Sequence, residues 1–398
     1  MNRKELLSIL PKDEAVLDVA HLLSLRERID VELDKCSGGR ESGITLRFRG
    51  KENPRSIPKR IPAATLSPVF SFGTNRIYRG DNLGILKALL PKYRGKVKLI
   101  YLDPPFSTGR TFRVGGAGRT GGAVVAYQDH LTGSNYLSFL YERLVFCKQL
   151  LAENGVLYVH LCPKMAPYVK ILLDELFGCA AHSRTIIWKR TGSHPNARSY
   201  ANVHDVILFY PKSARFEFTP DYEPYPKNEI KSRFPHVDEG GRRFSCGDLA
   251  GESLKTAHDP AYRYEWNGHH RIWRCPRQTM ERLDREGLIY YSRTGLPRKK
   301  QFLDEAKGVA PTDVWEDIPP IHARSPERIG YPTQKPEKLL ERIIRSSTCE
   351  GDLVLDPFCG SGSTLAVATK LMRQWIGIDN GDLALTTCRK RFAIALRN

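Results

Sequence analysis

The chain has 398 residues, of which 41% are hydrophobic and 27% charged, and this composition excludes a wholly disordered, collagenous or disulfide-scaffold protein. Its 62 basic and 44 acidic residues give a net charge of +18, spread along the chain. Such an excess favours a polyanionic partner.

No apolar run approaches the roughly 18 residues that a membrane helix needs. The first residues run into the charged positions Lys12, Asp13 and Glu14 without a sustained apolar stretch, so no secretory signal is visible. We therefore expect a cytoplasmic protein with no membrane contact. The nine cysteines form no Cys-x-x-Cys pair, which favours free thiols over disulfides or metal ligands.

Residues 1–60 are predicted to contain a helix and a basic linker. Apolar residues at helical spacing predict an amphipathic helix over 13–34. Residues 36–60 are rich in glycine, proline and basic side chains and show little periodicity. This pattern is typical of a linker, either solvated or touching a phosphate backbone.

Residues 61–211 alternate between short apolar strands and helices from about residue 76 onward. The predicted strands are 97–102, 156–161, 184–189 and 203–210, and the predicted helices are 135–152 and 165–177. Residues 212–330 lose this alternation and become rich in Arg, Tyr, Trp, Pro and Gly, which predicts an insertion or a second domain.

Residues 331–398 resume the alternation. Helices are predicted over 336–347, 363–372 and 382–396, and strands over 353–355 and 375–378. Strands alternating with helices predict an α/β fold with a parallel, doubly wound sheet. In such a sheet, ligands bind outside the carboxyl ends of the strands.

Two motifs follow predicted strands and should therefore meet at one edge of the sheet. The first is Asp103-Pro104-Pro105-Phe106. The two proline rings fix the backbone and remove N–H donors, so the Asp103 carboxylate and the Pro104 carbonyl remain as acceptors. Phe106 adds a flat face for stacking. These features suit an aromatic amine such as a nucleobase amino group, although a strand end punctuated by prolines would look the same.

The second motif runs from Asp356 through Phe358 to Gly360 and Gly362 and leads into a helix. Glycines at this place let the backbone approach a cofactor closely, and Asp379, after the next strand, stands where a ribose is commonly held. Leu365 occupies the place of a third glycine. A nucleoside cofactor without a pyrophosphate therefore fits better than a dinucleotide, and a plain strand-to-helix turn is the alternative.

Together with Arg79–Asn82, His204–Phe209 and Pro332–Pro336, these motifs resemble those of the S-adenosylmethionine-dependent DNA amino-methyltransferases. The catalytic motif precedes the cofactor loop, which is similar to the permuted order of the beta group. The resemblance implies a Rossmann-like, doubly wound methyltransferase sheet with a permuted motif order. It also implies a target-recognition insertion over 212–330, for which a structural insert is the alternative.

The resemblance further implies the roles of individual residues. Asp103, Pro104, Pro105 and Phe106 would be catalytic, and Asp103 in place of Ser favours adenine over cytosine. Asp81 would lie near the cofactor adenine and Asp379 near its ribose. The other residues implied at the cofactor are Asp103, Asp356 and, around the methionine end, Thr333, Gln334, Lys335, Pro336, Phe358, Gly360 and Gly362.

The sequence thus predicts direct methyl transfer from S-adenosyl-L-methionine to the N6 amino group of a flipped-out adenine in double-stranded DNA, without a metal. The glycine-rich segment 111–125 is interpreted as a mobile cover or as a passive surface loop. DNA cytosine-N4 methylation, a nicotinamide dehydrogenase and a non-enzymatic DNA-binding protein are the alternatives. A homodimer and an accompanying restriction endonuclease stay open.

Overall fold

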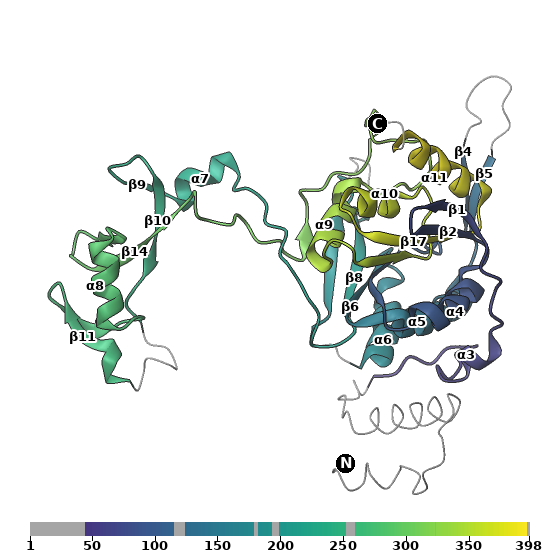
Figure 1. The fold of residues 1–398 in the computed structure, drawn as a ribbon, viewed down its shortest axis with the longest axis horizontal. Coiled ribbons are helices and arrows are strands. Elements are labelled where there is room, and N and C mark those ends of the chain that lie inside the picture. The colour runs from purple at the N-terminus through teal and green to yellow at the C-terminus, as the bar shows by residue number, and fades with distance from the viewer. Residues whose placement is uncertain are drawn as a thin grey trace, which may run out of the picture. The chain divides into compact units, whose positions relative to one another are not determined.

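The computed structural model describes residues 44–114, 124–178, 182–192, 199–251, 259–322 and 324–395. The predicted helix over 13–34 lies outside these ranges. The chain divides into two compact units, one comprising residues up to Thr219 and from Thr312 onward, the other Pro220–Pro311 (Figure 1). The second unit lies within the segment 212–330, where the sequence predicts an insertion.

A nine-stranded sheet organises the first unit, in the order β1-β2-β17-β16-β3-β6-β8-β7-β15. The strands are β1 Pro68–Phe72, β2 Asn75–Arg79, β3 Val97–Leu102, β6 Leu151–Leu161, β7 Arg184–Lys189, β8 His204–Pro211, β15 Val314–Trp315, β16 Leu353–Asp356 and β17 Gln374–Asp379. All run in one direction except β1 and β8, so the sheet is mostly parallel, as predicted, and contains two antiparallel strands that the sequence did not indicate. Only Gly73 and Thr74 join β1 to β2, and so short a link permits only antiparallel pairing.

Helices cover both faces of the sheet, which confirms the doubly wound α/β class (Figure 1). One face carries α3 Ile57–Arg60, α4 Asn82–Tyr93, α5 Gly133–Leu150 and α6 Ala166–Phe177; the other carries α9 Glu337–Ser347, α10 Ser363–Lys370 and α11 Asp382–Ala395. Side chains of β3 alternate between the two cores, with Ile100 and Leu102 in one and Leu99 and Tyr101 in the other. This burial on both sides explains why β3 reads as a continuous apolar run.

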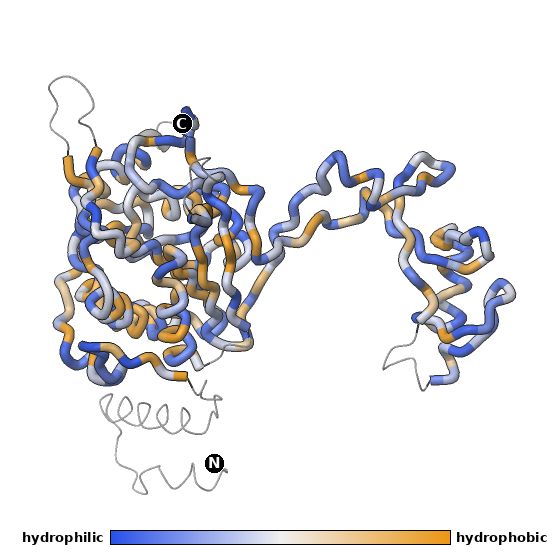
Figure 2. The backbone as a smooth tube through the Cα atoms, turned by 180° about the vertical axis from the view of Figure 1, so that it is seen from behind, coloured by the Kyte–Doolittle hydropathy of each residue, from blue (hydrophilic) through white to orange (hydrophobic). Residues whose placement is uncertain are grey.

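Hydrophobic segments, orange in Figure 2, run through the interior of this unit, and hydrophilic segments lie toward its periphery. Two fully buried aromatic side chains of this core, Tyr101 and Trp188, also line the cavity described below. Among the described residues, no helix combines the length and the apolar character that crossing a membrane requires.

A short hairpin of β4 Arg110–Val114 and β5 Val124–Asp129 stands apart from the main sheet. The sequence shows no packing pattern over 111–125, yet both ends of that segment are strands. The physical reason is a cross-strand aromatic pair, in which the rings of Phe112 and Tyr127 stack with centroids 4.7 Å apart. Residues 115–123, the middle of the predicted cover, lie outside the described ranges.

The second unit has antiparallel strands and a small core of its own around Trp273, Met280 and Leu283. Its four-stranded sheet has the order β13-β14-β10-β9, and β11 and β12 form a separate hairpin. Its elements are α7 Lys227–Arg233, β9 His236–Val237, β10 Arg243–Asp248, η1 Pro260–Tyr262, β11 Arg263–Trp266, β12 His269–Ile272, α8 Arg277–Arg285, β13 Ile289–Tyr291 and β14 Pro297–Phe302. Hairpins explain why the strand-and-helix alternation stops here.

Candidate active site

A cavity of about 1070 Å³ opens at the carboxyl ends of the parallel strands. Strands β3 and β16 are parallel neighbours, with Leu99 opposite Val354 and Ile100 opposite Leu355. The two motifs that follow them therefore meet at one edge, as predicted. The predicted site residues that line the cavity are Asp81, Asp103, Pro104, Pro105, Phe106, Thr333, Gln334, Lys335, Pro336, Asp356, Phe358, Gly360 and Asp379.

The loop after β3 is held in place by Asp129, a residue that the sequence did not single out. Its buried carboxylate accepts the backbone N–H groups of Phe106, Ser107 and Thr108 at 3.1, 2.8 and 2.8 Å. The Thr108 hydroxyl donates a further hydrogen bond at 2.6 Å. Because Ser107 has a φ of 58°, this turn is strained and needs such anchoring. The hairpin thus fixes the Asp-Pro-Pro-Phe motif.

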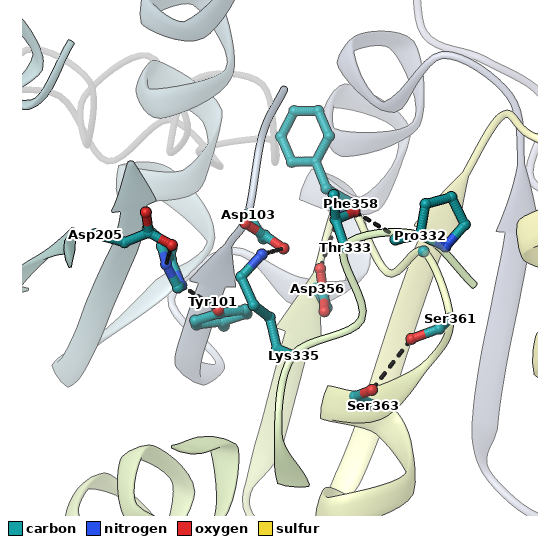
Figure 3. A network of polar contacts seen from close by, with 12 residues as sticks. Tyr101, Asp103, Asp205, Pro332, Thr333, Lys335, Asp356, Phe358, Ser361 and Ser363 are labelled. Atoms are coloured by element: carbon teal, nitrogen blue, oxygen red, sulfur yellow. Dashed lines mark hydrogen bonds and ion pairs between the residues drawn. The ribbon is translucent and has the colours of Figure 1, made fainter. Parts of the chain in front are cut away.

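Asp103 forms an ion pair with Lys335, whose Nζ lies 2.5 Å from Asp103 Oδ2 (Figure 3). Lys335 is 9% exposed, and its Nζ also lies 5.2 Å from the centroid of the Phe106 ring. The resemblance implied a place for Lys335 at the methionine end of the cofactor. In the structure its ammonium group lies beside Asp103 and Phe106 of the Asp-Pro-Pro-Phe motif.

A buried histidine lies beneath the motif. The His160 ring is fully buried, with its centroid 5.7 Å from that of Phe106. Its Nδ1 lies 2.8 Å from the Tyr101 hydroxyl and its Nε2 3.2 Å from Asp205 Oδ2. Burial and the nearby charge of Lys335 lower the pKa of His160, so the ring is neutral at pH 7. Neutral His160 therefore donates from Nε2 to Asp205 and accepts from Tyr101.

Strand directions explain how Asp205 reaches this place. Since β8 runs antiparallel to β6, its first residues lie at the edge where β6 ends, and the register pairs Leu161 with Val206. In the sequence, Asp205 was noted only as part of His204–Phe209, one of the segments that resemble the methyltransferase motifs. The available signal for His160 was a histidine at the carboxyl end of an otherwise apolar strand.

The loop after β16 is stabilised by two aspartates. Asp379 accepts the N–H groups of Gly360 and Gly381, each at 2.8 Å, and Asp356 accepts the N–H of Phe358 at 3.0 Å. Burial, with smaller contributions from Asp103 and Asp379, raises the pKa of Asp356 to about 7. This accumulation of carboxylates favours a positively charged ligand.

The two glycines of this loop have different roles. Gly360 and Gly362 both have positive φ, 48° and 74°. A Cβ on Gly360 would meet the ring of Tyr331 at 3.4 Å, beside the cavity. A Cβ on Gly362 would lie 2.8 Å from Cys388 Sγ. Gly362 is therefore not part of the cavity lining. Its lack of a side chain instead allows the loop to pack on α11.

Asp81 stands at the start of α4, where it accepts the N–H of Leu83 at 3.2 Å and Arg143 Nη2 at 2.6 Å. Its side chain remains 66% exposed on the cavity side. The neighbouring Asn82 donates to the carbonyl of Pro357 at 2.7 Å. This contact ties the start of α4 to the loop after β16, so Asp81 lies beside that loop.

The segment before α9 completes the cavity. Thr333 has a φ of 60°, and its hydroxyl lies 3.3 Å from that of Tyr127 in β5. The side chain of Gln334 accepts the N–H of Ile329 at 3.0 Å and donates to the carbonyl of Glu327 at 2.7 Å. The Gln334 amide thus holds its own loop, while Pro336 is the N-cap residue of α9.

Comparisons with known proteins identify similar chains. The model of a DNA methylase family, covering N6 and N4 methyltransferases, matches residues 97–387. The type II methyltransferase M.EcaI of Enterobacter cloacae is 36% identical over 368 residues, which cover 88% of this chain and 78% of that protein. The DNA adenine methyltransferase YhdJ of Escherichia coli K12 is 25% identical over 312 residues, with coverages of 76% and 77%. The solved complex of M1.HpyAVI with S-adenosylmethionine is similar with a TM-score of 0.42 at 18% identity, covering 79% of this chain and 98% of that one.

Proposed function

Because the chain belongs to the DNA methylase family whose model matches residues 97–387, we propose that it methylates the N6 amino group of adenine in duplex DNA. The protein is a DNA amino-methyltransferase, a class that comprises N6-adenine and N4-cytosine enzymes. The choice of adenine is supported by Asp103 at the first position of the motif and by the adenine specificity in the name of the Escherichia coli relative. The main support for methyl transfer is that Asp103 and the loop of Asp356 and Gly360 line the same cavity.

The cavity fits S-adenosyl-L-methionine. Asp379 and Asp81 line the cavity and can accept hydrogen bonds from a ribose and an adenine, and Gly360 leaves room for close approach. Asp103, Asp356 and Asp379 bring three carboxyl groups to the cavity lining, which suits a cationic sulfonium. When bound, this cofactor supplies an electrophilic methyl group.

The chain's own residues orient the amine. The adenine amino group is a weak nucleophile because its lone pair is delocalised into the ring. Asp103 and the Pro104 carbonyl each accept a hydrogen bond from one of its N–H groups. This arrangement favours a pyramidal nitrogen whose lone pair points away from both acceptors. Orientation and electrostatic stabilisation then provide most of the catalysis.

A paired base cannot reach Asp103, so the target base must leave the duplex. Phe106 offers a ring on which the flipped base stacks, and His160 supports that ring from behind. A cavity of about 1070 Å³ exceeds the volume of most single-ligand sites and accommodates a base beside a cofactor. Target recognition by the insertion 212–330, a homodimer, a companion endonuclease and a cytoplasmic location stay predictions.

The test is methyl transfer to duplex DNA with S-adenosyl-L-methionine that carries a deuterated methyl group. After digestion to nucleosides, mass spectrometry should find the label on deoxyadenosine, at N6. The matched control omits the protein but keeps the labelled cofactor. Label on the cytosine amine would overturn the choice of base, and label on RNA alone would overturn the choice of substrate.

A further inference from the structure

Lys335 reaches the catalytic motif from a distant part of the chain. Its ammonium group contacts Asp103 Oδ2 at 2.5 Å, although 232 residues separate the two positions (Figure 3). Both side chains are largely withdrawn from water, with 10% of the Lys335 side chain and 20% of the Asp103 side chain exposed. An ion pair with so little exposure restrains its members more than a surface pair does.

The position of Lys335 is prepared by its surroundings. Gln334, immediately before it, is hydrogen-bonded to the backbone of Glu327 and Ile329. Pro336, immediately after it, is the N-cap residue of α9. Because the backbone is fixed on both sides, the long side chain projects from a rigid base toward Asp103. The ammonium group also lies 5.2 Å from the centre of the Phe106 ring, within the range of a cation–π contact.

One cation therefore restrains both groups that would meet the target base. With Oδ2 paired to Lys335, the other oxygen of Asp103 remains for an N–H of the amine. A carboxylate free to rotate would present this oxygen in many directions, and only one of them is productive.

We propose that Lys335 is a positioning residue that orients the Asp103 carboxylate, and that it does not bind the methionine end of the cofactor. The proposal rests on the proposed function, since it concerns the same amine. Lys335 would thus contact the Asp-Pro-Pro-Phe motif, whereas the sequence resemblance implied a contact with the cofactor.

Two ligands distinguish these roles. S-adenosylhomocysteine has the carboxylate of the methionine end, whereas methylthioadenosine lacks it. A lysine that binds this carboxylate contributes to the affinity for the first ligand only. A lysine that orients Asp103 contributes little to the affinity for either, and its loss reduces the rate of methyl transfer.

The experiment compares Lys335→Met and Lys335→Arg with the unchanged chain. Calorimetry gives the affinity for each ligand, and single-turnover transfer is measured at saturating cofactor and DNA. We expect Lys335→Met to slow transfer about 100-fold and to change both affinities less than about 3-fold. Lys335→Arg keeps the cation and should recover at least about a tenth of the normal rate. Lys338→Met, three residues further on and about half exposed, is the matched control and should transfer normally.

A double-mutant cycle tests whether Lys335 acts through Asp103. In the Asp103→Asn background, Lys335→Met should change the remaining rate less than about 3-fold, because the charge it orients is already absent. If Lys335→Met does not fold, Lys335→Gln takes its place in every measurement.

Two results would overturn the proposal. One is a loss of affinity confined to S-adenosylhomocysteine with normal transfer at saturating cofactor, which would return Lys335 to the methionine end. The other is normal transfer with both affinities unchanged, which would leave Lys335 without a role. A wild-type chain that fails to methylate any DNA amine would instead refute the proposed function itself.

Discussion

Asp129 should control the rate of methyl transfer without touching substrate. Its carboxylate accepts four hydrogen bonds from the loop after β3 that carries the Asp-Pro-Pro-Phe motif, three of them at Oδ2. In Asp129→Asn, one oxygen remains and the amide NH₂ group faces N–H donors. At least one charge-assisted hydrogen bond is lost and one donor is left unpaired, which should lower the free energy of unfolding by about 2–4 kcal/mol.

The same change should loosen the position of Phe106 and of the residues before it. A misplacement on the order of 1 Å reduces a well-oriented reaction about 100-fold, so single-turnover transfer should fall by about this factor. Cofactor affinity should change less than about 3-fold, since the hydrogen bonds given for the Asp129 carboxylate go to the loop after β3. Urea unfolding, calorimetry with the cofactor and single-turnover transfer measure the three quantities.

Thr108→Val is the matched comparison, because it removes only the hydroxyl hydrogen bond to Asp129 and leaves the backbone bonds. It should cost about 0.5–1.5 kcal/mol of unfolding free energy and slow transfer much less. If Asp129→Asn lowered stability as expected but transferred at the normal rate, the carboxylate would be structural only. Asp129 would then not position the motif for methyl transfer.

Three further results are expected. Asp379→Asn should weaken cofactor binding by about 1–3 kcal/mol in calorimetry, and unchanged affinity would exclude Asp379 from the cofactor site. Burial raises the pKa of Asp356 from 3.8 to about 7, so the folded chain keeps a proton that the unfolded chain releases first. The free energy of unfolding should therefore fall by about 4 kcal/mol as pH rises from about 4 to about 7. In Asp356→Asn, urea unfolding should show a pH profile that lacks this part of the decrease. A variant with the same pH profile as the unchanged chain would contradict this role of Asp356. Binding to non-specific DNA should weaken steeply with salt because the chain carries +18, and a flat titration would mean that this charge serves solubility alone.

The order of strands and helices in the first unit could be predicted because its apolar runs are continuous. Six consecutive buried residues mark β3, whose predicted bounds 97–102 match those observed. Strand direction was harder, since the antiparallel pairing of β8 with β6 depends on its place between β6 and β7. The hairpin of β4 and β5 was missed because the glycine-rich stretch between its strands hides the pairing of Phe112 with Tyr127.

Some residues of the candidate site could likewise be predicted from the sequence, and others could not. Asp103 and the glycine loop could be found because rules for strand ends and turns place them locally. The partners of Asp103 could not, because the sequence carries no signal for a contact between Asp103 and Lys335 across 232 residues. Asp129 looked like a strand-end aspartate with no distinguishing pattern, and its role appears only when the hairpin lies against the motif.

The central claim is that Asp103 accepts a hydrogen bond from the target amine while the cofactor is bound elsewhere in the same cavity. The most direct measurement is single-turnover methyl transfer by Asp103→Ala at saturating S-adenosyl-L-methionine and DNA, with cofactor affinity measured beside it. We predict that transfer falls at least about 1000-fold while cofactor affinity stays within about 1 kcal/mol of normal. Near-normal transfer by a folded Asp103→Ala variant would contradict the account, whatever the family of the chain.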